Sequence, residues 1–125
     1  MKTLLWLDDY RDPLKDNWLV FSPIEQPFEV IWVKSYQEFK DYIVDNGLPT
    51  AICFDHDLGF TNEYYIENNL PSPEVEKTGM DCAKWLVWWC QEHNLKLPLY
   101  NIQSANPIGK DNIDGLLKSF IKFNS

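Results

Sequence analysis

Residues 51–60 read AICFDHDLGF, and this stretch decides the fold class. The four residues 51–54 are apolar and run directly into Asp55, His56 and Asp57. A short, continuous apolar run is typical of a strand that is buried on both faces of a parallel sheet. Carboxylates at the end of such a strand are costly to bury without a partner, so their pattern indicates that a positive group is held there.

The same reasoning, applied outward along the chain, predicts strands separated by helices or long connections. We expect strands at residues 3–7, 28–33, 51–54 and 99–103. We expect a helix with a capping box at Ser35 and Glu38 that ends at Asn46 and Gly47, a helix from 79 to about 93, and a last helix with an apolar stripe from Ile113 to Ile121.

Two connections look irregular. Residues 11–27 contain Pro13, Pro23 and Pro27, which predicts a short or irregular first crossover, and residues 60–78 read as a long inserted loop. Alternating strands and helices favour right-handed crossovers and a parallel sheet. We therefore expect one α/β domain over residues 1–125, with a three-layer, flavodoxin-like architecture that stops after about four strands.

Composition narrows the possible functions. The chain has 125 residues, of which 45% are hydrophobic, and 19 acidic against 11 basic residues give a net charge of −8. This excess of acid argues against an extended nucleic-acid surface. No apolar run approaches the ~18 residues of a membrane span, and three cysteines in apolar contexts predict reduced core thiols. We expect a cytoplasmic protein.

Acidic and polar groups follow three of the predicted strands. In parallel α/β sheets, ligands bind beyond the carboxyl ends of the strands, so these groups should meet at one edge. A divalent cation relieves the repulsion between clustered carboxylates, and all-oxygen ligands favour Mg²⁺ or Mn²⁺. The predicted metal ligands are Asp8, Asp9, Asp55 and Asp57.

Basic and polar groups near the same edge suit a phosphate. Arg11 is the only arginine in the chain, and its planar guanidinium can bind phosphate in a bidentate manner. Backbone amides at the start of the last helix could add an anion site. The predicted substrate-binding residues are Arg11, Ser104, Asn106 and Lys110.

Four motifs carry a resemblance to known proteins. The stretches LLWLDDY, AICFDHDL, TGMDCAKWL and YNIQSANP resemble the receiver domains of response regulators. A closer resemblance is to the cyclic-phosphate processing receiver-like group, on the motifs DDYRDP (8–13), FDHDLG (54–59), TGMDCAKWL (78–86) and SANPIGKDNI (104–113).

The receiver resemblance implies roles for individual residues. It makes Asp8 and Asp9 a metal-binding pair, Asp55 a phosphoacceptor or metal ligand, and Asp57 a further coordinating position. Ser104 would contact a phosphoryl oxygen. A receiver also has a fifth strand that bears a lysine. We expect no such strand in this sequence, and Lys110 could replace that lysine.

The resemblance to the cyclic-phosphate group implies a metal-dependent phosphoesterase that acts on a cyclic phosphate of a nucleotide or an RNA end. His56 would then act as the general acid or base, because its pKa lies near neutrality. The predicted catalytic residues are Asp55, His56, Arg11, Ser104 and Lys110. Two other functions stay open: a signalling module phosphorylated on Asp55, and a non-catalytic binding protein with a relict site.

Each of these residues also has a purely structural interpretation. Asp8 and Asp9 could cap a turn, Asp57 could belong to a turn before Gly59, and His56 could make a structural hydrogen bond. Arg11 could pair with Asp12 or Asp16, and Ser104 and Asn106 could cap the last helix.

Overall fold

The computed structural model describes residues 2–9, 11–15, 17–55, 78–103 and 107–123. Within these residues, four parallel strands form one sheet in the order β2-β1-β3-β4. The strands are β1 (Thr3–Leu7), β2 (Glu29–Val33), β3 (Ala51–Phe54) and β4 (Leu99–Ile102). The helices are α1 (Tyr36–Asn46), α3 (Gly79–His93) and α4 (Pro107–Phe123), with a 3₁₀ helix, η1, at Trp18–Phe21.

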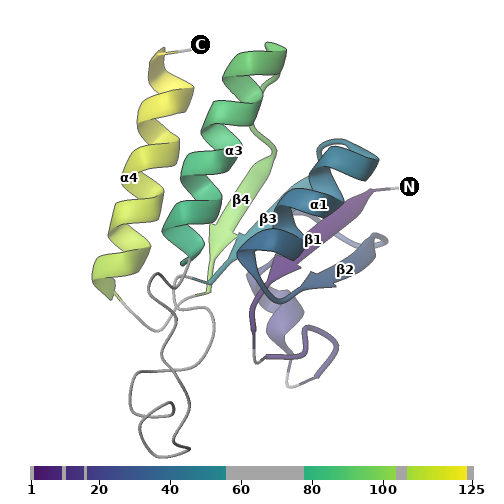
Figure 1. The fold of residues 1–125 in the computed structure, drawn as a ribbon. Helices are drawn as coiled ribbons and strands as arrows, with labels where there is room; N and C mark the ends of the chain where they lie inside the picture. The colour runs from purple at the N-terminus through teal and green to yellow at the C-terminus, as the bar shows by residue number, and fades with distance from the viewer. Residues whose placement is uncertain (1, 10, 16, 56–77, 104–106, 124–125) are drawn as a thin grey trace, which may run out of the picture.

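The two faces of the sheet have different covers. Helices α1, α3 and α4 pack on the face formed by Leu5, Leu7, Ile52 and Phe54 (Figure 1). On the opposite face, η1 and the segment around it cover Leu4, Trp6, Ala51 and Cys53. Because both faces are covered, residues 4–7 and 51–54 are fully buried, which explains their continuous apolar sequence.

Helices α1 and α3 begin at polar N-cap side chains, and α1 ends at a glycine that adopts a positive φ. The Ser35 hydroxyl accepts a hydrogen bond from the Glu38 amide at 3.1 Å, and α1 ends at Gly47, whose φ is 83°. Thr78 caps α3 through a capping box with Asp81. These caps satisfy backbone groups that the helices themselves leave without partners.

The predicted fold class is confirmed, with small differences at two strands. β2 begins one residue later than predicted, and β4 ends at Ile102 rather than at residue 103. The first crossover is irregular, as expected, and contains only the short helix η1 within the described part of residues 11–27. Most of the predicted loop at 60–78 lies outside the described residues. Cys53, Cys82 and Cys90 are free and buried, and none of the described helices is long and apolar enough to cross a membrane.

Candidate functional site

The parallel register places Asp8, Asp55 and Gln103 in one row just beyond the ends of β1, β3 and β4. Successive backbone hydrogen bonds hold this row: Asp8 N to Val33 O at 3.0 Å, Asp55 N to Leu7 O at 3.0 Å, and Gln103 N to Phe54 O at 2.9 Å. The three residues are 0%, 7% and 5% exposed. Side chains at one register level of a parallel sheet point to the same face. The row is therefore a buried polar layer above the apolar core.

Three carboxylates meet at this row. Asp8, Asp9 and Asp55 each offer an oxygen atom, and these atoms all lie within 4.8 Å of one another. Three negative charges at such distances repel strongly in a partly buried setting. Carboxylate oxygens are the ligands that Mg²⁺ and Mn²⁺ prefer, so the set of donor atoms fits a divalent cation.

Arg11 contacts the acidic cluster from the η1 side of the sheet. Its backbone N–H donates to Asp8 Oδ1 at 3.0 Å, and its Nη1 lies 3.7 Å from Asp8 Oδ2. The same Nη1 donates to the backbone oxygen of Gln103 at 3.0 Å, and the guanidinium lies 4.7 Å from the ring centroid of Trp18. Within the described residues, this guanidinium and the three carboxylates together carry two net negative charges when all are ionised. A single divalent cation would balance them.

Two tryptophans fix the backbone beneath the cluster. Trp32 Nε1 donates to Asp8 O at 2.7 Å, and Trp6 Nε1 donates to Arg11 O at 3.1 Å. Trp6 and Trp32 are register partners on adjacent strands, so their rings hold the turn that follows β1. Sequence analysis missed this role, although both residues lie one position before the last residue of their strands.

Gln103 is the second residue that sequence analysis missed. Its Nε2 donates to Leu7 O at 3.0 Å, while its Oε1 is buried and accepts no hydrogen bond from any described residue. Its position was the available signal: a polar residue at the end of an apolar strand, in register with Asp55.

The other predicted site residues fall into two groups. Lys110 is exposed in the first turn of α4, and its charge contributes to lowering the pKa of Asp114. His56, Asp57, Ser104 and Asn106 lie outside the described residues.

Two of the structural interpretations can be compared with the described contacts. Asp8 does cap a turn, through its bond from the Arg11 amide. Among the described residues, Arg11 forms an ion pair with Asp8, whereas Asp12 accepts a bond from the Leu14 amide. Asp16, the other partner considered for Arg11, lies outside the described residues.

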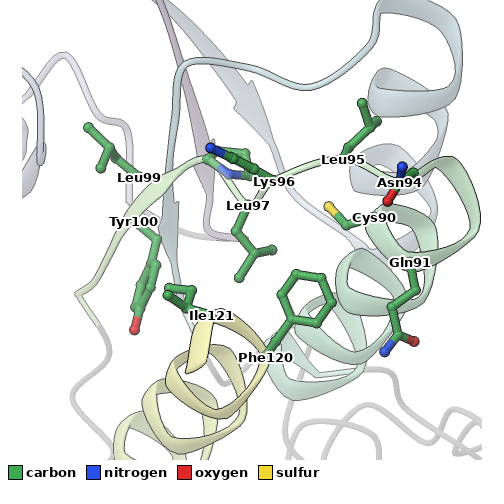
Figure 2. A pocket seen from close by; sticks show the side chains of 11 residues that line it. Cys90, Gln91, Asn94, Leu95, Lys96, Leu97, Leu99, Tyr100, Phe120 and Ile121 are labelled. Atoms are coloured by element: carbon green, nitrogen blue, oxygen red, sulfur yellow. The ribbon is translucent and has the colours of Figure 1, made fainter. Parts of the chain in front are cut away.

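A cavity of about 760 Å³ lies at the other end of the sheet (Figure 2). The last turn of α3, the residues before β4 and the end of α4 surround it. No acidic residue lines this cavity within the described chain, and burial raises the pKa of the Cys90 thiol to about 11. A thiol with that pKa is a poor nucleophile at neutral pH. The candidate reactive groups therefore lie at the carboxyl edge of the sheet.

Residues 3–119 match the model of one protein family, described as the cyclic-phosphate processing receiver domain. The chain belongs to this family. The match confirms the resemblance drawn from the motifs, and it extends from β1 through most of α4. A search among curated proteins finds none that matches the chain.

Proposed function

We propose that this receiver-like domain is a metal-dependent phosphoesterase that opens a cyclic phosphate on a nucleotide or an RNA end. The observation that carries the proposal is the meeting of Asp8, Asp9 and Asp55 within 4.8 Å, beside the guanidinium of Arg11. Membership of a family associated with cyclic-phosphate processing supports the substrate class.

The three carboxylates would hold Mg²⁺ or Mn²⁺, with Asp57 as a further predicted ligand. When bound, the ion would supply Lewis acidity at the phosphoryl group and lower the pKa of a bound water. In ring opening, the water oxygen forms a bond to phosphorus and releases one proton to solvent, one ester P–O bond breaks, and a proton goes to the departing ribose oxygen. His56 is the predicted donor of that proton.

Arg11 would bind the phosphoryl oxygens. Its Nη1 is already held by Gln103 O, and its planar group lies over the ring of Trp18. The side chain keeps 23% of its surface exposed, so its other N–H groups can reach a ligand. A donor fixed in advance stabilises developing charge without reorganisation. Lys110, Ser104 and Asn106 complete the proposed substrate contacts.

The proposal is tested by ³¹P NMR on a 2′,3′-cyclic nucleotide and on a short RNA that ends in a cyclic phosphate, each with Mg²⁺ or Mn²⁺. We expect cation-dependent ring opening that Asp55→Asn abolishes and that the surface variant Asp45→Asn leaves unchanged. Intact substrate in both reactions would overturn the proposal. A phosphorylated protein formed instead from a small phosphodonor, and lost in Asp55→Asn, would favour the signalling function.

A further inference from the structure

Gln103 is the neighbour of Asp55 in the polar row, and its side-chain oxygen is a buried acceptor. Gln103 is 5% exposed, and no described residue donates to its Oε1. A buried polar atom without a partner has an energetic cost, so such atoms are rare in folded proteins. A group that arrives with positive charge or a donor would remove this cost.

The orientation of the amide is fixed by its surroundings. The oxygen of Leu7 is an acceptor, so the amide nitrogen of Gln103 must face it, as the 3.0 Å bond requires. An inverted amide would place two oxygens against each other. The Leu7 carbonyl belongs to the peptide group that leads into Asp8. The amide nitrogen of Gln103 therefore binds the backbone next to Asp8, and the amide oxygen has no hydrogen-bond donor among the described residues.

The side-chain amide of Asn101 provides a comparison, because both its nitrogen and its oxygen form hydrogen bonds. Asn101 points to the same face of β4, two residues earlier. Its Nδ2 donates to Phe21 O at 2.7 Å, and its Oδ1 accepts from the Ile102 amide at 2.9 Å. Both amides are tied to the backbone through nitrogen, but only Asn101 has a described partner for its oxygen. The difference lies at the end of the strand where the carboxylates meet.

We propose that Gln103 Oε1 is a neutral oxygen ligand of the divalent cation held by Asp8, Asp9 and Asp55. This inference rests on the cation site of the proposed function but not on the phosphoesterase reaction. Amide oxygens are suitable ligands for hard divalent cations. A neutral ligand adds a coordination bond without adding to the repulsion among the three carboxylates.

The test is the Mn²⁺ affinity of the whole chain, measured by calorimetry at fixed ionic strength. Gln103→Met keeps the length of the side chain and removes its oxygen, and we expect about tenfold weaker binding. Gln103→Glu lowers stability because its second oxygen faces Leu7 O, but it keeps an oxygen in the place of Oε1, and we expect the folded variant to bind Mn²⁺ at least as tightly as the wild type. Asn101→Leu is the matched control, and it should leave the Mn²⁺ affinity unchanged even where it lowers the melting temperature.

The outcomes separate the two proposals. Wild-type affinity in Gln103→Met, or an equal loss in Asn101→Leu, overturns the role of Gln103. If Gln103→Met does not fold, Gln103→Glu decides, because weaker binding than the wild type overturns the inference. A wild-type chain that does not bind Mn²⁺ overturns both proposals. Reduced Mn²⁺ binding in Gln103→Met without any ring opening by the wild type leaves the ligand role intact and removes the phosphoesterase.

Discussion

At the scale of single residues, Arg11 makes more contacts within the site than its sequence pattern indicated. Its guanidinium contacts Asp8, the backbone of Gln103 and the ring of Trp18, while its backbone oxygen receives the indole of Trp6. A lysine could supply the charge but not the flat shape that lies over an indole. Arg11 therefore acts as part of the framework as well as a candidate phosphate ligand.

We expect Arg11→Met to lower the free energy of unfolding by about 1.5–3 kcal/mol, because hydrogen bonds that involve a charged group contribute that much to stability. The methionine keeps an apolar stem near Trp18 but loses the bond to Gln103 O and the ion pair with Asp8. Urea denaturation at pH 7 measures the change. Lys15→Met, which removes an exposed charge from the same segment, is the control and should be nearly neutral. Equal losses in the two variants would contradict the role of Arg11 in the framework.

At the scale of elements, the stability of α3 depends on its N-cap residue, Thr78. The Thr78 amide donates to Asp81 Oδ2 at 2.7 Å, and the Asp81 amide donates to Thr78 Oγ1 at 3.4 Å. We expect Thr78→Ala to cost about 1 kcal/mol of stability, as loss of an N-cap usually does. Thr78→Ser keeps the hydroxyl and should cost much less. Urea denaturation of both variants checks this, and an equal effect would show that the methyl group matters instead.

A polar contact between side chains joins β4 to α4. Tyr100 Oη donates to Asp114 Oδ1 at 2.8 Å, and Lys118 Nζ lies 2.8 Å from Asp114 Oδ2. The hydrogen bond from Lys118 is the largest cause that lowers the pKa of Asp114 below its ordinary value of 3.8. A lowered pKa in the folded state means that the contribution is present above pH 4 and lost as the pH falls through the folded value.

We therefore expect Asp114→Asn to destabilise the protein at pH 7 and to have less effect at pH 3. The cost at pH 7 should stay below about 1 kcal/mol, because Asp114 is about one third exposed and surface ion pairs are weak. Urea denaturation at pH 7, 5 and 3 gives the comparison. Asp111→Asn, on the exposed side of α4, is the control. A cost that grows toward low pH would contradict this sign.

The strands and long helices could be predicted because burial on one or two faces leaves a periodic or continuous apolar pattern. The meeting of Asp8, Asp9 and Asp55 could be inferred because parallel strands end at one edge. The position of Gln103 was a signal, but its bond to Leu7 O and the bond of Trp32 to Asp8 O could not be predicted, because they join segments that lie far apart in the sequence. The bond of Trp6 to Arg11 O depends on the path of the turn after β1, which the sequence pattern does not give. Helix η1 was missed because three prolines and a four-residue length give no helical period.

At the scale of the whole molecule, the cation site should couple to folding. The three carboxylates come from the ends of β1 and β3, so they gather only when the sheet has formed. A ligand that binds only the folded state raises its stability by about 2.7 kcal/mol at 100 times its Kd. We expect Mn²⁺ to raise the Tm well beyond NaCl of the same ionic strength, and Asp8→Asn to remove the extra shift. A shift no larger than that of NaCl would mean that the cation only screens the net charge of −8.

The hydrogen bond between Arg11 and Gln103 joins residues 92 positions apart, and this has a consequence for synthesis. Arg11 leaves the ribosome long before Gln103 does. The turn after β1 is therefore synthesised before the Gln103 carbonyl that accepts a hydrogen bond from Arg11. The polar row can close only when β4 has emerged and paired with β3. A nascent or prematurely terminated chain that stops before residue 103 would therefore carry the acidic residues but not the finished site.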